Sequence, residues 1–448
     1  MKEYRNKEME TMPDRDMKEI QMRLLKKQLT FAFQNSPLWK KKIEQGGIKF
    51  QDIDKITYEA FSNIPFTTKQ EIRESQEKAP PFGEHLCAPA RKIIRVQSSA
   101  GTTGKPVYQA FTRHDVANVN EMQARGFVAC GIKPGDRIIN MYALSMFSGG
   151  IPICASFEAY GLMNIPVGAE AGAERLLRLA KDLEARVLLG TPSYANYLAE
   201  KCPEILGIPA FKLGIEIIKV GGEPGGEDPA FRKKLEMAWG TEKIYDSGSM
   251  SDAYPNTFSN CYKRVGKHQL TPDFALIEFI DPDSGKRIEI EDGAEGEYLI
   301  THLDREACPL VRYRSGDRIK ISTSPCECGR TGMRISYLGR TDDMLIVRGM
   351  NVYPQAVRSV ICDFLPDTTG EMRIILDRPG HQVTPPVNIA VEYSEKLDRE
   401  KKPILKEKLE EAIRSKLHFR SNIELVPPKS IERSVMKTKL VVIKNPIE

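Results

Sequence analysis

The chain has 448 residues, of which 41% are hydrophobic and 28% are charged, a composition typical of a globular enzyme with two or three domains. Its net charge of +5 comes from 66 basic and 61 acidic residues without the basic stripe that nucleic-acid binding needs. The apolar runs are too short to cross a bilayer, and the charged N-terminal segment lacks the apolar core of a signal peptide. We therefore expect a cytoplasmic protein that contacts neither nucleic acid nor membrane.

The first half of the chain alternates between strand and helix patterns. Apolar residues recur with helical periodicity over residues 16–44. Short apolar runs then predict strands at 93–96, 137–141, 186–190 and 215–220, with a helix at 174–183. Such alternation favours an α/β body with doubly wound, mostly parallel sheets. Further strands at 275–280 and 296–301, joined by a Pro/Gly-containing turn, predict a more antiparallel β subdomain.

A domain boundary is predicted near residues 340–343. Beyond it the sequence predicts a strand at 345–347, a helix at 353–364, strands at 373–376 and 387–393, and a helix at 403–417. The expected organisation is a large N-terminal domain over residues 1–339 and a small, mobile α+β domain over residues 343–448.

A glycine- and hydroxyl-rich segment, residues 97–106, directly follows the first predicted strand. Glycines let a backbone approach phosphate closely, hydroxyls add donors, and a lysine adds a cation. It is not a Walker A sequence, because Pro106 follows the lysine. The hydroxyls and the cation exceed what a hairpin turn requires, so we predict phosphate binding. The residues concerned are Ser98, Ser99, Gly101, Thr102, Thr103, Gly104 and Lys105.

This segment resembles the Ser-Ser-Gly-Thr-Thr-Gly-Lys-Pro signature of acyl-adenylate-forming enzymes, and in particular of the phenylacetate–CoA ligase family. Ala100 stands where that family has its second serine. Other stretches resemble the same family in the same order, namely residues 37–48, 64–73, 221–224, 309–317 and 339–354. The resemblance implies an ATP-dependent ligase that joins an aryl or arylacetic acid to CoA through an acyl-adenylate. It also implies ATP/AMP, Mg²⁺ and CoA as ligands, and we expect a homodimer.

The resemblance also assigns the nucleotide site. The adenine side is carried over to Gly221, Gly222, Glu223 and Pro224, which follow a predicted strand. The next loop comprises Asp246, Ser247, Gly248, Ser249, Met250, Ser251 and Asp252. Here Ser251 keeps a hydroxyl for the α-phosphate, and Asp252 keeps a carboxylate for Mg²⁺, a cation that prefers oxygen ligands. Gly248 replaces the aromatic residue that stacks on adenine, and we suggest Tyr245 or Tyr254 as its substitute.

Five more residues are carried over from the same family. Asp317 is expected to accept the ribose hydroxyls, and Arg340 to bind phosphate. The hinge falls on Asp342 or the adjacent Asp343, and Gly349 is expected in the pantetheine tunnel. Near the C-terminus Lys437 aligns with the lysine that stabilises charge during adenylation, with Lys439 as the alternative.

A zinc site is predicted from the cysteine spacing. Nine scattered cysteines in a large chain favour free thiols over a disulfide framework. Cys326 and Cys328 form one pair of ligands, and Cys261 and His268 offer a second pair that would close a tetrahedral, structural site. Cys308 and His302 are the spare candidates.

The acid-binding pocket is expected beside the predicted strand that ends near residue 141. Candidate lining residues are Tyr142, Phe147, Ser148, Gly149 and Gly150, with Ala253, Tyr254 and Pro255 opposite, and an aromatic lining suits a planar aromatic acid. Two other interpretations stay open at this point. One is an adenylating enzyme that passes its acyl group to an acceptor other than CoA. The other is a non-catalytic nucleotide-binding protein, suggested by the altered loop at Gly248 and Asp252.

Overall fold

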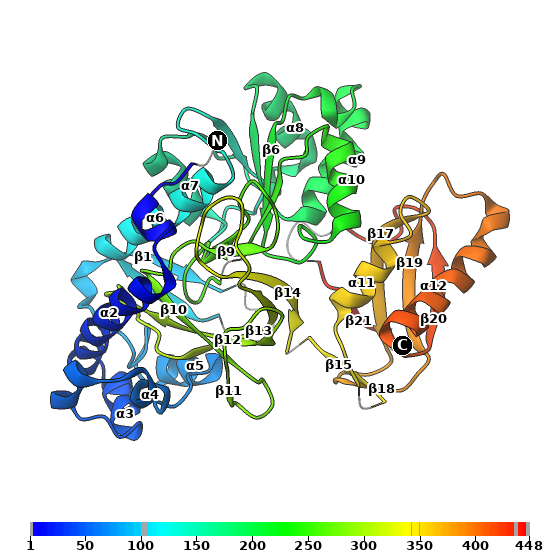
Figure 1. Cartoon of the computed structure of the whole chain (residues 1–448). Coiled ribbons are helices and arrows are strands. Elements are labelled where there is room, and N and C mark those ends of the chain that lie inside the picture. Colours follow the sequence, from blue (N-terminus) through cyan, green and yellow to red (C-terminus); the bar gives the residue numbers. More distant parts are fainter. Residues whose placement is uncertain are drawn as a thin grey trace.

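The computed structural model describes residues 3–99, 106–248, 250–341, 343–348, 350–433 and 438–444. A large N-terminal part contains a twelve-stranded sheet, and a small C-terminal part lies beside it (Figure 1). Among the described residues, no helix combines the length and the apolar character that a membrane span requires.

One section of the large sheet is parallel and has helices on both faces. Its strands run in the order β4-β3-β5-β6-β7. Leu188 and Ile218 pack with residues of α8, α9 and α10, whereas Val187 and Ile217 pack on the opposite face with Phe127 and Phe157 of α6 and α7. This alternation along each strand confirms the doubly wound α/β fold. The elements are β3 (Arg137–Asn140), β4 (Met163–Ile165), β5 (Val187–Gly190), β6 (Ile217–Gly221), β7 (Ile244–Gly248), α6 (Arg113–Ala129), α7 (Ile151–Tyr160), α8 (Gly172–Asp182), α9 (Pro192–Leu206) and α10 (Pro229–Trp239).

The antiparallel strands continue this sheet rather than forming a separate one. From β7 the order runs β8-β9-β14-β13-β12-β10-β11, and every neighbouring pair is antiparallel. The predicted β subdomain is therefore an extension of the parallel section. Its strands are β8 (Phe258–Ser259), β9 (Lys267–Gln269), β10 (Ala275–Ile280), β11 (Arg287–Ile288), β12 (Glu295–His302), β13 (Tyr313–Ser322) and β14 (Arg334–Arg340).

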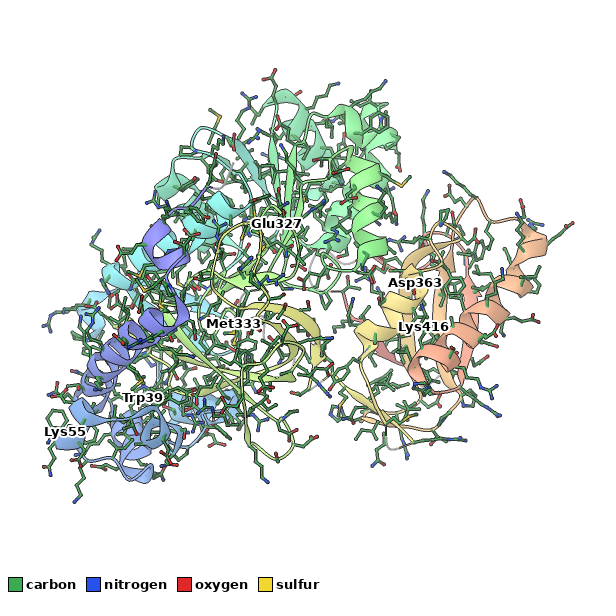
Figure 2. All side chains as sticks on the ribbon, in the orientation of Figure 1. Trp39, Lys55, Glu327, Met333, Asp363 and Lys416 are labelled. Carbon is green, nitrogen blue, oxygen red and sulfur yellow. The ribbon has the colours of Figure 1, made fainter. Side chains whose placement is uncertain are left out.

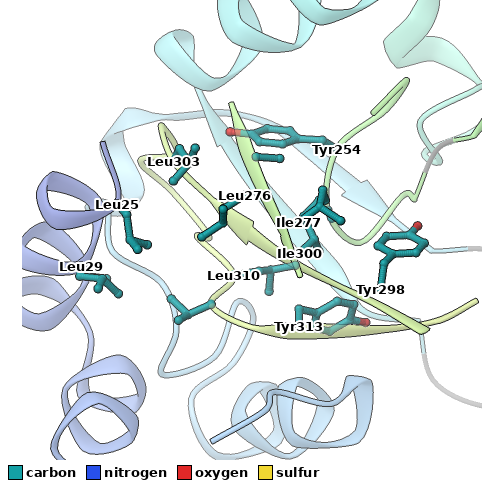
Figure 3. Packing of buried hydrophobic residues seen from close by; sticks show 14 of the residues in the cluster. Leu25, Leu29, Tyr254, Leu276, Ile277, Tyr298, Ile300, Leu303, Leu310 and Tyr313 are labelled. Atoms are coloured by element: carbon teal, nitrogen blue, oxygen red, sulfur yellow. The ribbon is translucent and has the colours of Figure 1, made fainter. Parts of the chain in front are cut away.

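The N-terminal helices cover the antiparallel section. Leu25 and Leu29 of α2 face Leu276, Leu303 and Leu310 (Figure 3). The helix expected over residues 16–44 is two helices, because Ser36 caps α3 and Pro37 occupies its first turn. The elements are α1 (Lys7–Glu10), α2 (Asp14–Asn35), α3 (Pro37–Gln45), η1 (Phe50–Lys55), α4 (Tyr58–Ser62), α5 (Lys69–Lys78), η2 (Ala90–Lys92), η3 (Ala169–Ala171) and η4 (Ala210–Lys212).

The C-terminal part has its own hydrophobic core. Figure 1 shows it at the right, with α11 on the side facing α10. The salt bridge between Asp363 and Lys416, 2.7 Å long, links the end of α11 to α12 (Figure 2). Its strands form two small sheets, in the orders β16-β15-β18 and β20-β19-β17-β21. The elements are β15 (Leu345–Val347), β16 (Met350–Val352), α11 (Pro354–Cys362), β17 (Thr368–Leu376), β18 (Gln382–Val383), β19 (Val387–Tyr393), η5 (Arg399–Lys401), α12 (Lys402–Leu417), β20 (Ser421–Val426) and β21 (Val441–Ile443).

Candidate active site

Several predicted site residues meet at the carboxyl edge of the parallel strands. Gly221, at the end of β6, pairs with Ser247 of β7. A Cβ atom at Gly221 would lie 2.6 Å from the Ser247 carbonyl oxygen, so only glycine fits at this crossing. Gly222 has a φ of +81°, which makes the turn after β6 possible. Ligands of open α/β sheets bind at this edge, so the fold places the glycine turn where a nucleotide site is expected.

The aromatic candidates for the acid pocket lie beside the same turn. Tyr142 and Phe147 form an edge-to-face pair with ring centroids 6.1 Å apart. The Tyr142 hydroxyl reaches the glycine turn, since a Cβ atom at Gly221 would lie 3.4 Å from it. Gly149 is packed between both rings, and its Cβ atom would come within 2.9 Å of Tyr142 Cδ2. The structure thus brings the predicted acid pocket and the predicted nucleotide turn into contact.

Ser251 and Asp252 lie on the opposing loop and have defined partners. The Ser251 hydroxyl is 3.1 Å from that of Ser148, which joins this loop to the Tyr142 segment. Asp252 is buried, and its Oδ2 atom accepts hydrogen bonds from Lys69 Nζ at 2.8 Å and from the Tyr313 hydroxyl at 3.1 Å. The other oxygen, Oδ1, is buried and has no hydrogen-bond partner among the described residues. This oxygen is the one that fits a hard cation, because a buried carboxylate oxygen requires a donor or a metal.

Lys69 is a site residue that the sequence did not reveal. It is the first residue of α5, whose start is fixed by a capping box between Thr68 and Glu71. The ion pair with Asp252 spans 183 residues of sequence, so no local spacing could indicate it. The sequence signal for Lys69 was its position within residues 64–73, which resemble an N-terminal segment of the phenylacetate–CoA ligase family.

The predicted ribose and phosphate residues lie next to each other. Asp317 of β13 pairs with Arg340 of β14 in the sheet, and Arg340 Nη1 donates to Asp317 Oδ1 at 2.8 Å. Burial and the neighbouring Asp252 raise the pKa of Tyr313 well above its ordinary value, and the Arg340 guanidinium opposes this shift. Tyr313 therefore connects the Asp317–Arg340 pair to Asp252.

Three of the predicted aromatic and apolar site residues are buried in the core. Tyr254 is fully buried, its hydroxyl donates to the Asp304 carbonyl oxygen at 2.8 Å, and its ring packs against His302. Ala253 is 1% exposed, and Tyr245 belongs to the core beneath α6 and α7. Core packing encloses the rings of both tyrosines, so in this structure neither is exposed for stacking on adenine. The lining of the acid pocket by Ala253 and Tyr254 stays a prediction.

Asp246 and Glu223 have protein partners in this structure. Asp246 is buried, with Lys267 Nζ 3.6 Å from its carboxylate, and burial raises its pKa to about 6. Glu223 accepts hydrogen bonds from the backbone N–H groups of Ser193 and Thr438. The Pro224 carbonyl oxygen faces Arg358, 3.4 Å from its Nη1 atom. Their nucleotide contacts stay predictions.

Part of the predicted site lies outside the described residues. Ser98 ends β1 (Ile93–Ser98), which pairs with β2 (Tyr108–Thr112), and Ser99 accepts from the Val107 N–H. The predictions that fall outside the described residues concern Gly101, Thr102, Thr103, Gly104, Lys105, Ser249, Asp342, Gly349 and Lys437.

The four predicted zinc ligands form one cluster. The ligand atoms of Cys261, His268, Cys326 and Cys328 all lie within 4.8 Å of one another. The Sγ atoms of Cys261 and Cys326 are 3.8 Å apart, and Cys328 Sγ is 3.4 Å from His268 Nε2. A tetrahedral zinc site needs sulfur–sulfur edges of about 3.8 Å, so these residues fit the ion. His268 Nδ1 faces the Gly332 carbonyl oxygen at 3.1 Å, which leaves Nε2 as the ligand atom.

The N-terminal segment packs against this cysteine loop. Arg330, two residues after Cys328, forms a fully buried 2.7 Å ion pair with Glu10, and the Tyr4 hydroxyl donates to the Cys328 carbonyl oxygen. Hydrogen bonds with Cys261 and His268 lower the pKa of Cys328, whereas the contact with Cys328 raises the pKa of Cys261, so Cys328 is the thiol of this pair that ionises first. Glu327, between the two cysteines, is labelled in Figure 2. Cys308 and His302 are not members of the cluster.

The comparison with known proteins agrees with this geometry. The phenylacetate–coenzyme A ligase of Thermus thermophilus is 31% identical over 444 residues, which cover 95% of this chain and 96% of that protein. The chain belongs to the phenylacetate–CoA ligase family. The Escherichia coli phenylacetate–coenzyme A ligase is 29% identical over 420 residues, with coverage of 94% and 93%. Residues 349–444 match the family model of the AMP-binding enzyme C-terminal domain.

Solved structures related to the phenylacetate–CoA ligase family add information on domain position. One is a crystal structure of 2-hydroxyisobutyryl-CoA ligase in the postadenylation state, in complex with R3-HIB-AMP, which is 27% identical to this chain. The match covers 98% of this chain and 92% of that one, with a TM-score of 0.90. The same ligase in the thioesterification state, with 2-HIB-AMP and CoA, is 28% identical, with coverage of 97% and 91% and a TM-score of 0.72. The two parts of this chain are therefore arranged as in the postadenylation state.

Proposed function

We propose that this chain is an ATP-dependent acid–thiol ligase that activates an aryl or arylacetic acid. In the first step a carboxylate oxygen attacks the α-phosphorus of ATP, and the bond to pyrophosphate breaks. In the second step the CoA thiolate attacks the acyl carbon, and AMP leaves. The observation that carries the choice of acid is the Tyr142–Phe147 pair against the glycine turn at Gly221, since two aromatic faces suit a planar ring.

The described residues supply most of the groups that the first step requires. Ser251 would donate to the α-phosphate, and the free oxygen of Asp252 would hold Mg²⁺, which neutralises the triphosphate. Asp317 and Arg340 form an ion pair in this structure. When ATP binds, Asp317 would accept the ribose hydroxyls instead, and Arg340 would bind phosphate. Lys69 pairs with the other oxygen of Asp252 at 2.8 Å, which fixes the orientation of the carboxylate.

A panel of acids tests the proposal. Purified enzyme is incubated with ATP, Mg²⁺ and phenylacetate, benzoate or 2-hydroxyisobutyrate, with and without CoA, and AMP is measured. We expect CoA-dependent AMP release with an aromatic acid. Preference for 2-hydroxyisobutyrate would instead support the second candidate, a short hydroxy acid, which the close fit to 2-hydroxyisobutyryl-CoA ligase favours. Acid-dependent pyrophosphate exchange without CoA turnover would indicate another acceptor, and absence of exchange would indicate a non-catalytic nucleotide-binding protein.

The proposed lysine has its own test. Lys437→Ala should abolish adenylation, because the charge that develops at the α-phosphate loses its cation, yet spare thioester formation from supplied acyl-adenylate. Lys439→Ala tests the alternative lysine, two residues away, and should keep adenylation if Lys437 is the catalytic residue. Adenylation by Lys437→Ala at the parent rate would move the assignment to another residue.

We also propose that the cysteine cluster binds a structural Zn²⁺. Four protein ligands leave no open position, so the ion would tie the loop after Cys326 to β9 without taking part in the reaction. Metal analysis should find about one zinc per chain. Cys328→Ser should lose it, whereas Cys308→Ser, a buried cysteine outside the cluster, should keep it. Zinc-free parent protein would contradict the proposal.

Three further properties are proposals. The domain boundary at 340–343 is supported by the end of β14 at Arg340 and the start of β15 at Leu345. Free thiols at all nine cysteines suit the reducing cytoplasm. A homodimer is tested by light scattering of the purified protein.

A further inference from the structure

The two parts of the chain meet through a set of polar contacts near the glycine turn. Ser359 of α11 donates to Asp228, the N-cap of α10, at 2.7 Å. Lys234 of α10 donates to the Thr369 carbonyl oxygen of β17 at 2.9 Å. These contacts join residues of the N-terminal part to residues beyond the predicted hinge. Figure 1 shows α10 next to α11 at this junction.

Glu223 makes the contact that lies closest to the candidate active site. Glu223 is buried at the glycine turn, with 9% of the residue exposed. One oxygen accepts from the Ser193 N–H at 2.9 Å, at the start of α9, and the other from the Thr438 N–H at 2.8 Å. One carboxylate therefore bridges the carboxyl edge of the central sheet and the C-terminal tail. Bonds from N–H groups to a carboxylate are stronger than bonds between neutral groups.

A second contact, an arginine–carboxylate ion pair, holds the tail at Arg433, five residues before Thr438. Arg433 binds Glu392 of β19 through both terminal nitrogens, at 2.7 and 2.9 Å, and lies 3.8 Å from Glu200 of α9. The tail is thus anchored to the C-terminal part at Arg433 and to the N-terminal part at Thr438. Of these tail contacts, the one at Thr438 and the longer one to Glu200 depend on how the two parts are arranged, whereas the Arg433–Glu392 pair does not.

We propose that Glu223 is a positioning residue for adenylation, which holds the tail at residue 438 against the active site and releases it for thioester formation. The inference rests on the proposed two-step reaction. In the sequence Thr438 directly follows Lys437, the predicted catalytic residue, so we expect the bond at Thr438 to matter for adenylation. Because the domain arrangement matches the postadenylation state, the observed bond belongs to the first step. The carboxylate acts here through the tail and not through adenine.

Half-reaction kinetics test the assignment. In Glu223→Ala both N–H groups lose their charged acceptor, so we expect acid-dependent pyrophosphate exchange to fall at least about tenfold. Thioester formation from supplied acyl-adenylate should change less than about threefold, because the proposal has this bond broken during the second step. Glu223→Gln keeps one acceptor oxygen and should recover part of the exchange activity. Glu216→Gln, directly before the start of β6 and paired with Arg186, is the matched control.

A measurement without substrates separates this inference from the proposed function. Hydrogen–deuterium exchange of the peptide that contains Thr438 should be faster in Glu223→Ala than in the parent, and unchanged in Glu216→Gln. Ser359→Ala, which removes another contact between the two parts, should shift both readouts in the same direction by a smaller amount. Equal loss of both half-reactions, a raised KM for ATP alone, or unchanged amide exchange would overturn the assignment. Failure of the parent with every acid would refute the proposed function, while amide exchange would still decide the role of Glu223.

Discussion

Adding one methyl group at Gly149 is expected to disturb the acid pocket and leave the nucleotide site intact. In Gly149→Ala the new Cβ atom would lie 2.9 Å from Tyr142 Cδ2 and 3.1 Å from Phe147 Cε2. Carbon atoms prefer separations of at least about 3.5 Å, so the Tyr142 ring must retreat by about 0.6 Å. Overpacking of this kind costs about 1–3 kcal/mol, which corresponds to about 5- to 150-fold in an equilibrium constant.

Initial-rate kinetics with the preferred aromatic acid measure this effect. We expect the KM for the acid to rise about tenfold or more and the KM for ATP to rise less, because the new methyl group meets the Cδ2 and Cε2 edge of the Tyr142 ring and the glycine turn lies near Cε1 and the hydroxyl. A second substitution, Phe147→Leu, creates room beside the new methyl group, so the double variant should recover part of the loss. Parent-like kinetics of Gly149→Ala, or an equal effect on both substrates, would refute the location of the pocket.

Two further predictions concern ATP binding and acid stability. Gly248→Tyr should lower the KM for ATP about fivefold by restoring a ring that stacks on adenine. The substitution is sterically possible, since the nearest atom to a Cβ at Gly248 is Phe258 Cβ at 3.6 Å, and a KM that does not fall would contradict the stacking role. Burial, aided by the charge of Arg305, lowers the pKa of His85 from 6.5 to about 4. Below pH 6.5 the unfolded chain therefore binds this proton more readily than the folded chain, and the free energy of unfolding falls. Between pH 7.5 and 5.5 this loss is about 1 kcal/mol. In urea unfolding, His85→Gln should reduce the pH dependence of the unfolding free energy by that amount. An unchanged dependence on pH would show that His85 titrates normally.

Local sequence was sufficient for the elements and for the glycine turn. The strand that ends at Gly221 and the helix near residue 174 follow from hydrophobic periodicity, which depends only on neighbouring residues. Gly222 was recognisable as a turn residue because its left-handed conformation is a backbone property. Cys326 and Cys328 were recognisable as a possible pair of metal ligands because they lie one residue apart, whereas the fold brought Cys261 and His268 to them.

Only the tertiary structure decided which side chains meet. Asp252 was expected from its motif, but its partner Lys69 lies on a helix 183 residues earlier. Tyr254 looked like a pocket residue and is enclosed in the core, and Glu223 looked like an adenine contact and binds the tail at Thr438. Backbone conformation is set by short-range sterics and hydrogen bonds, whereas burial and ion pairing depend on distant segments packing together, and that information is not contained in any local stretch of the sequence.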